Sequence, residues 1–301
     1  TITATQSDSF TPNGAGRATP GGTVDYSIQI GNTGGDSALN VRLDNPTPAN
    51  TTLVPGSLRT TCLALNDAYS ATGNISITIS AGSGVLVNDR DPDNVGPALT
   101  ATPISGGATT QGGNVTLAAD GGFTYNPPAG FNGADTGTYT LNDGEGNTDT
   151  ATVTITVSGM IWFINENLAS AGDGRLSTPF NTLAAFQAVN NNAGNNPGDN
   201  DNIFLYESAD NYTGGIVLRP GQRLIGQDSS STLAALAGVT PPAGSAPLPA
   251  MNVTPATVSR ILNASGVAIT LGSNCQIHGL TVGSGTGFGI SGNTFGTLTT
   301  S

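Results

Sequence analysis

The sequence predicts an all-β fold: two β-sandwiches followed by a parallel β-helix with one short capping α-helix. Residues 151–157 read ATVTITV, and apolar side chains at every second position have the period of a half-buried strand. Short alternating runs of the same kind precede this strand. From residue 158 onward, short strands follow at even spacing, joined by Gly, Asn and Ser, which is typical of stacked coils.

Composition restricts the class of protein. The 301 residues include 43 Gly and 18 Pro, so turns are frequent and long helices are not expected. All eight basic residues are arginine, which excludes lysine chemistry, and 20 acidic residues disfavour nucleic acid as a partner. No apolar run reaches about 18 residues, so no transmembrane segment is expected. Scarce charge and abundant Thr, Asn, Ser and Gly favour an extracellular protein of the bacterial cell surface, either cleaved from a leader or part of a longer chain.

The first predicted domain is residues 1–64. Residues 23–30 and 39–44 alternate in polarity on either side of a turn at 32–36, which predicts two antiparallel strands. The run PGGTVDYSIQIGNTG from Pro20, followed by LVPGSL from Leu53, resembles the immunoglobulin-like repeat of large bacterial surface proteins. The resemblance implies an immunoglobulin-like sandwich.

The second predicted domain is residues 65–157, where short strands recur every 8 to 12 residues, as in a sandwich. Three motifs occur in order: GVLVNDRDPD from Gly84, GGFTYNPPAGFNG from Gly121 and DGEGNTDTATVTITV from Asp143. Together they resemble the cadherin-like (VCBS-type) tandem repeats of giant bacterial adhesins. Gly137 stands where such repeats place an aromatic residue, so a thinner core is expected there.

The third predicted domain is residues 158–301. Strands are predicted over residues 161–164, 203–206, 215–218, 223–226, 260–263, 267–271, 276–282, 288–290 and 297–299. A single helix is predicted with Thr178 as its N-cap and Pro179 as its first residue. Residues 232–255 are predicted to be a loop leaving the coils. The runs IWFIN, GDGRLSTPFNTLAAF and VLRPGQRLIGQ resemble the start of secreted right-handed parallel β-helices, in which the helix caps the open end.

Catalytic residues are not predicted, and we expect no enzyme. Glycoside hydrolysis needs two carboxylates close together, yet residues 229–301 contain no Asp or Glu. The acids of the third domain lie in its first part and its loops, which is typical of solvated turns. His278, the only histidine, has no acidic or nucleophilic neighbour in the sequence and is predicted to be a surface or stacked side chain.

Calcium is the only cofactor that the residues suggest. Residues 65–157 carry nine acidic residues against one arginine, and carboxylates in turns can supply the six to eight oxygens of a calcium site. The candidate ligands are Asp67, Asp89, Asp91, Asp93 and Asp143. The alternative is that these Asx-rich turns satisfy their own backbone and stay solvated, and the sequence leaves both readings open.

The function expected from these features is a structural segment of a bacterial surface protein, acting in adhesion or as a fibre building block through exposed strand edges. Partners would be other copies, joined head to tail, or other surface proteins. In one form, the first five residues of one copy add to the open β-helix end of the next. The alternative is a β-helix that binds or processes carbohydrate, with polysaccharide as its partner and the sandwiches as spacers.

Overall fold

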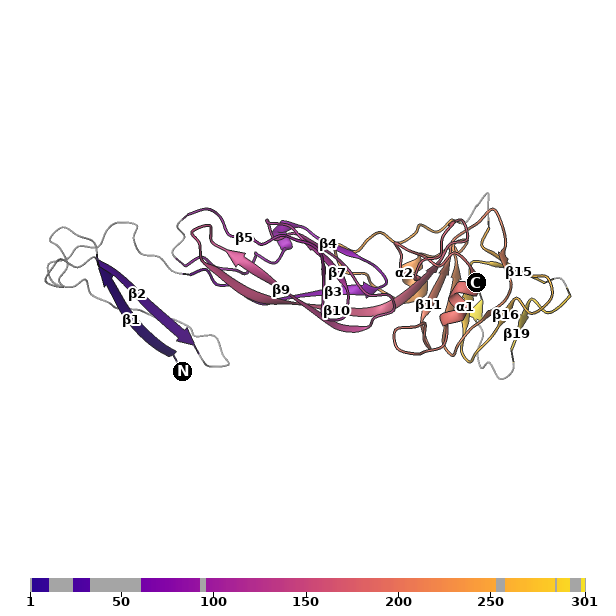
Figure 1. Cartoon of the computed structure of the whole chain (residues 1–301). Coiled ribbons are helices and arrows are strands. Elements are labelled where there is room, and N and C mark those ends of the chain that lie inside the picture. The colour runs from indigo at the N-terminus through magenta and orange to yellow at the C-terminus, as the bar shows by residue number, and fades with distance from the viewer. Residues whose placement is uncertain are drawn as a thin grey trace. The chain divides into compact units, whose positions relative to one another are not determined.

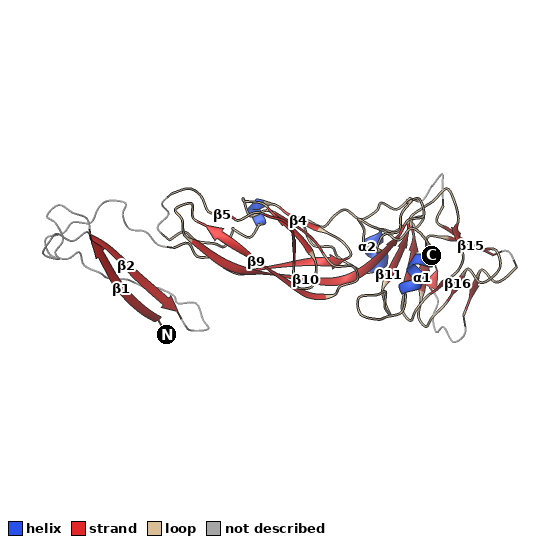
Figure 2. Cartoon of the chain, viewed as in Figure 1, coloured by secondary structure: helices blue, strands red, loops and turns tan. Residues whose placement is uncertain are grey.

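The computed structural model describes residues 2–10, 24–32, 61–92, 96–252, 258–284, 286–292 and 299–300. Strands dominate these residues and helices are few, which confirms the all-β class (Figure 2). The chain divides into two compact units, Thr1–Ser57 and Leu58–Ser301. None of the described helices is long and apolar enough to cross a membrane.

The first unit contains one antiparallel pair, formed by β1 (Ile2–Phe10) and β2 (Val24–Asn32) (Figure 1). The register runs from Ile2 opposite Asn32 to Phe10 opposite Val24. The strand predicted over residues 23–30 is therefore confirmed as β2. Its expected partner, residues 39–44, lies outside the described residues, and the partner seen is β1.

Two sheets enclose the core of residues 61–157. The first contains, in order, β5 (Thr100–Ala101), β9 (Gly133–Asn142), β10 (Thr148–Ile164) and β3 (Asp67–Gly73). The second contains β4 (Ile77–Ile79), β8 (Phe123–Asn126), β7 (Asn114–Leu117) and β6 (Ile104–Ala108). A 3₁₀ turn, η1 (Ala81–Ser83), follows β4. The alternation in residues 151–157 is confirmed, because Ala151, Ile155 and Val157 are buried while the threonines point to the other face.

Strand β10 is 17 residues long and belongs to both halves of the second unit. Its first part pairs with β9 and β3, and residues Ile161 to Ile164 pair in parallel with β11 (Asn202–Leu205). The sequence predicts two strands here, separated by three residues, but the chain stays extended between them. A register shift between Ser158 and Met160, with Gly159 at φ +70°, lets the strand bend without ending.

Residues 158–301 form three ladders of parallel strands that the chain visits in turn. The first ladder continues from β10 and β11 to β14 (Arg223–Gly226), β17 (Gln276–His278) and β20 (Thr299–Thr300). The second contains β12 (Tyr212–Thr213), β15 (Arg260–Asn263) and β18 (Thr281–Ser284). The third contains β13 (Ile216–Val217), β16 (Ile269–Thr270) and β19 (Ile290–Ser291). The predicted strands overlap most of these elements, but β12 was not predicted, and the single strand predicted over residues 276–282 is two strands, β17 and β18, in different ladders.

Helix α1 (Leu183–Val189) begins four residues later than predicted. Its N-cap is Thr182, whose hydroxyl accepts a hydrogen bond from the Ala185 N–H at 3.1 Å. The prediction of Thr178 and Pro179 as the helix start is wrong because Phe180 first pairs with β10, where its N–H donates to the Phe163 carbonyl. Leu183 and Phe186 of α1 then pack on the β10 side chains of the first coil.

A second helix, α2 (Leu233–Ala237), lies in the segment predicted to be a loop, so the prediction of a single helix is also wrong. Leu233 and Ala237 pack on Phe163, Phe204 and Ile225, the outer face of the first ladder. The chain then passes residues 61–157 again: Thr78 N–H donates to the Gly244 carbonyl and Ala246 N–H to the Ser76 carbonyl, both at 2.8 Å. Residues 244–246 thereby cover the edge of β4.

Candidate functional site

The candidate site lies around two of the predicted ligands, Asp67 and Asp89. Asp67 is the first residue of β3, and Asp89 lies in the turns that follow η1. Tyr139 on β9 joins them to the core: its hydroxyl lies 2.8 Å from both carboxylate oxygens of Asp89. The Leu65 N–H also donates to Asp89, at 2.8 Å. We call Asp67, Asn88 and Asp89, with the carbonyls of Leu65 and Asn66, the Asp67–Asp89 centre.

Burial raises the pKa of both carboxyl groups of the centre. Burial, and then the charge of Asp89, raise the pKa of Asp67 from 3.8 to about 6. Burial also raises the pKa of Asp89, against the hydrogen bonds from the Leu65 N–H and Tyr139. A carboxyl group such as Asp67, whose pKa is raised by burial and by a neighbouring carboxylate, favours either a bound proton or a bound cation.

Two buried oxygen atoms of the centre have no hydrogen-bond donor. They are Oδ2 of Asp67 and the side-chain oxygen of Asn88, whose amide nitrogen donates to the Asn66 carbonyl at 3.1 Å. Unpaired buried acceptors cost free energy, and a hard cation would satisfy them together. The donor set of carboxylate, amide and carbonyl oxygens fits calcium, which takes oxygen ligands in flexible geometry. Within the described residues no three His, Cys, Asp or Glu side chains gather, so amide and carbonyl oxygens would complete such a site.

Among the other predicted ligands, Asp143 is bound elsewhere. Asp143 is buried in its own turn, where it accepts hydrogen bonds from the Glu145 N–H, the Asn147 N–H and the Asn147 side chain at 2.7 to 3.0 Å. Although burial alone would raise its pKa, these donors lower it. Asp143 and Asp91 both act electrostatically on the Cys62 thiol. Asp93 lies outside the described residues.

Two functional residues of the centre, Tyr139 and Asn88, were not predicted. Asn88 directly precedes Asp89 in the GVLVNDRDPD motif, and its amide oxygen is a ligand that calcium accepts. Tyr139 alternates with Gly137 and Leu141 on the core face of β9, which predicts burial but does not identify its partner. Tyr139 and Asp89 are 50 residues apart in the sequence, and the packing of the two sheets brings them together.

A third buried acid, Asp135, serves the fold. It is fully buried and accepts hydrogen bonds from the Tyr125 hydroxyl at 2.8 Å, the Gln111 N–H at 2.9 Å, and the hydroxyls of Thr109 and Thr110. Although burial raises its pKa, these donors outweigh that effect and lower it. Asp135 therefore fixes the turn between β6 and β7 to β9.

Four acids of residues 158–301 follow strands of the first ladder in the sequence: Glu166, Glu207, Asp210 and Asp228. The pKa of Glu166 is raised by burial and by the charge of Asp210, and its Oε2 has no donor. Glu207 is held by the Asn252 amide at 3.1 and 3.2 Å, and Asp228 accepts the Ser259 N–H at 2.8 Å. Glu207 and Asp228 thus hold loops together. Oδ1 of Asp228, like Oε2 of Glu166, has no donor, and burial and the charge of Glu207 raise the pKa of Asp228.

His278 and the two cysteines are buried. His278 is only 6% exposed, and burial and then Arg223 lower its pKa, so the prediction of a surface histidine is wrong while the stacked alternative remains. Cys62 and Cys275 are buried free thiols.

Comparisons with known proteins identify one part of the chain. No curated protein sequence matches it. Among solved structures, an endo-fucoidan hydrolase of glycoside hydrolase family 107 (MfFcnA9) aligns with a TM-score of 0.24 and 16% identity, over 52% of this chain and 22% of the hydrolase. A sialyltransferase from Photobacterium damsela aligns with a TM-score of 0.18 and 7% identity, over 54% of this chain and 36% of the transferase. Such scores carry no argument about function. Residues 60–159 match the family model of the bacterial cadherin-like domain, which confirms the cadherin-like part of the prediction.

Proposed function

We propose that the chain is a non-catalytic structural segment of an extracellular bacterial surface protein, acting in adhesion or as a fibre building block. The cadherin-like match of residues 60–159 supports a structural role at the cell surface. The absence of lysine, the low charge content and the abundance of Thr, Asn and Gly support the same compartment.

We infer that residues 158–301 are the first coils of a right-handed parallel β-helix. The three parallel ladders support this, since from β11 onward each passage of the chain adds one strand to every ladder in turn. Parallel crossover connections are right-handed in almost all proteins, which gives the expected hand. Both faces of the first ladder are apolar, one packed in the interior and the other beneath α2.

The observation that carries the proposal is the junction between the cadherin-like half and the coils. Strand β10 passes from one to the other without a linker. Asn74 reinforces it: its side chain accepts the Gly130 N–H at 2.7 Å and donates to the Ile161 carbonyl at 3.0 Å, and its carbonyl accepts the Leu176 N–H. A protein that transmits force or holds an adhesive surface at a distance needs such a stiff joint.

The experiment is the insertion of six Gly and Ser residues between Ser158 and Gly159, inside β10. The same insert between Ser170 and Ala171, in an exposed loop, is the matched control. Calorimetry should show one cooperative transition for residues 58–301 in the parent and the control, and two in the β10 insertion. Small-angle scattering should show a wider range of conformations for the β10 insertion alone. Two independent transitions in the parent would contradict the proposed joint.

Head-to-tail assembly is the sharper form of the proposal. Strand β1 pairs with β2 over its whole length, so addition to another copy would use the other edge of β1. Deletion of residues 1–8 should abolish filaments in electron microscopy while calorimetry still shows residues 58–301 folded. Filaments that persist after the deletion would rule out strand addition by this segment.

Carbohydrate processing is the second candidate, favoured by the Glu166 and Asp210 pair. A carboxyl group with a raised pKa next to a second carboxylate is the arrangement that glycoside hydrolysis uses. Incubation with acidic polysaccharides should release no reducing or unsaturated ends if the structural proposal holds. Product that forms with the parent and the Asp120→Asn control, but not with Glu166→Gln, would replace the structural proposal by this one.

A further inference from the structure

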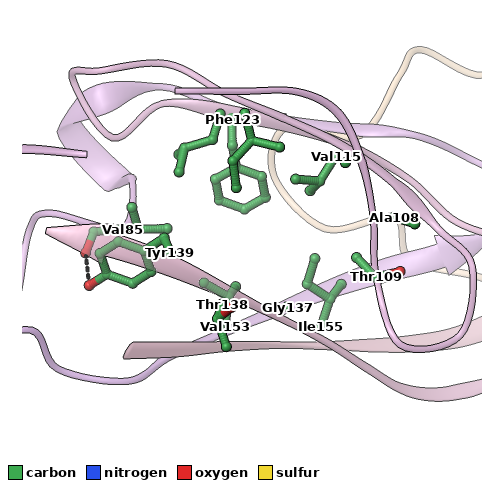
Figure 3. Close-up of a pocket in the computed structure, with 13 residues that line it drawn as sticks. Val85, Ala108, Thr109, Val115, Phe123, Gly137, Thr138, Tyr139, Val153 and Ile155 are labelled. Carbon is green, nitrogen blue, oxygen red and sulfur yellow. Dashed lines mark hydrogen bonds between the residues drawn. The ribbon is translucent and has the colours of Figure 1, made fainter. Parts of the chain in front are cut away.

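The core between the two sheets of residues 61–157 contains a half-open cavity of about 130 Å³. Figure 3 shows Phe123 and Val115 on one side and Gly137, Val153 and Ile155 on the other. The cavity is separate from the junction on which the proposed function rests.

Gly137 is the reason why this space is empty. It lies on β9 between the buried residues Asp135 and Tyr139, so its position faces the core. A Cβ atom at Gly137 would approach no atom closer than 3.8 Å, and the backbone there is not in the left-handed region. Neither conformation nor crowding requires a glycine. A glycine inside a strand weakens that strand, so the space beside Gly137 comes with a loss of stability.

The mouth of the cavity lies at the outer edge of β9. Ala108 and Thr138 are the lining residues that are exposed. On β9, the Thr140 carbonyl accepts the Thr102 N–H and the Thr136 carbonyl accepts the Thr110 N–H, both at 2.9 Å. The short strand β5 pairs only with the end of β9, so the edge at Thr138 between these two hydrogen bonds is left open.

Three lining residues carry hydroxyls, and those of Thr109 and Tyr139 are already engaged. The Thr109 hydroxyl donates to Asp135, and the Tyr139 hydroxyl donates to Asp89. Beside Val115, Phe123 and Ile155, a sugar would bury hydroxyl groups without partners, which is costly. The occupant that fits this lining is uncharged and apolar.

We propose that this cavity is a binding site for a compact apolar molecule of the size of one aromatic ring. An apolar cavity of roughly 150 Å³ in a protein core stays dry and binds benzene or xenon, and the present cavity is of similar size. The rings of Phe123 and Tyr139 on its walls favour an aromatic guest through edge and face contacts.

The test uses the full chain, with benzene and xenon as probes. Benzene should raise the thermal midpoint of the parent, and pressurised xenon should shift the NMR signals of the side chains around Gly137. Gly137→Leu fills the cavity, so it should raise the midpoint of the free protein and abolish the benzene effect. Gly82→Leu is the matched control, because Gly82 is exposed and also has open space at its Cβ, and it should respond to benzene like the parent.

Three results would overturn the proposal: no benzene shift in the parent, an equal shift in Gly137→Leu, or a shift of the same size with galactose. If Gly137→Leu does not fold, Gly137→Ala keeps the proposal testable. The smaller cavity of that variant should raise the dissociation constant for benzene several-fold. An unchanged constant would count against the site.

Discussion

The two halves of residues 58–301 bury polar groups in different ways. The cadherin-like half buries three carboxylates, Asp89, Asp135 and Asp143, together with a cavity at Gly137. The interior of the coils is filled by apolar side chains, and its buried polar side chains are neutral, such as Gln222 and Asn190, which hydrogen bond to each other at 2.8 Å. The difference predicts that fully buried carboxylates contribute to the pH dependence of the first half, whereas partly buried groups such as Glu166 contribute to that of the second.

The largest expected effect comes from Asn74, which belongs to both halves. Asn74→Ala leaves the Gly130 N–H and the Ile161 carbonyl without partners and places alanine at φ 68°, so the free energy of unfolding should fall by about 3 kcal/mol. Urea denaturation measures the loss. Asn192→Ala is the matched control, since Asn192 is exposed at φ 60°, and it should lose about 1 kcal/mol. Equal losses would show that Asn74 does not join the halves.

The next effect tests the dependence of the cadherin-like half on ionised carboxylates. Asp135→Asn exchanges an acceptor of four hydrogen bonds for a group that can accept fewer, and should cost about 2 kcal/mol at pH 7. The pKa of Asp135 is lowered in the folded state, so its stabilisation is present above about pH 3.8 and is lost as pH falls through the lower value.

Gln222→Ala provides the comparison from the coils. Gln222 is buried and neutral, and it donates to the Gly198 carbonyl at 2.9 Å. Its loss of stability should be the same at pH 7 and pH 3.5, whereas that of Asp135→Asn should shrink at the lower pH. Thermal denaturation at pH 7 and pH 3.5 measures both losses. If the two variants change in the same way between these pH values, the contrast between the halves does not hold.

The alternation of apolar and polar residues predicted most strands, because a strand with one buried face has an apolar side chain at every second position. It could not predict the α2 segment, since residues 232–255 carry no regular period and their position is set by contacts with Ile75 and the first ladder. The start of α1 was missed for a related reason, because Phe180 pairs with β10, a contact that no local signal reveals.

The candidate site was predictable in composition and not in arrangement. Acid-rich turns pointed to Asp67, Asp89 and Asp143 alike, but only the fold decides which carboxylates keep open oxygens. Asp143 accepts its hydrogen bonds within its own turn, as expected if Asx-rich turns satisfy their own backbone. The partner Tyr139 comes from a different strand, and its burial was the only signal in the sequence.

A smaller effect, of opposite sign, is expected at Asp67. Its pKa is raised to about 6, so its contribution is favourable below about pH 3.8 and is lost as pH rises through 6. Asp67→Asn should therefore stabilise the calcium-free protein at pH 7, by on the order of 1 kcal/mol once solvent screening is allowed for, and have no effect at pH 3.5.

At pH 7, calcium should make the parent more stable than Asp67→Asn. If the Asp67–Asp89 centre binds the ion, calcium raises the thermal midpoint of the parent and of Asp120→Asn, whose side chain accepts a hydrogen bond within its own turn, but not that of Asp67→Asn. If calcium still raises the thermal midpoint of Asp67→Asn, the ion binds elsewhere. If the parent does not respond to calcium, Asp67 holds a proton in place of an ion.

The smallest effect is expected in the coils, at the N-cap of α1. Thr182→Ala removes the acceptor of the Ala185 N–H and should cost about 0.5 to 1 kcal/mol, with no dependence on pH or calcium, because no carboxylate takes part. Thr182→Ser keeps the hydroxyl and is the control. Thermal midpoints at pH 7 and pH 3.5 measure the loss. Since α1 packs Leu183 and Phe186 on the first coil, a loss that grows on acidification would mean that titrating groups act on this packing, and the N-cap of α1 would then not be independent of charge.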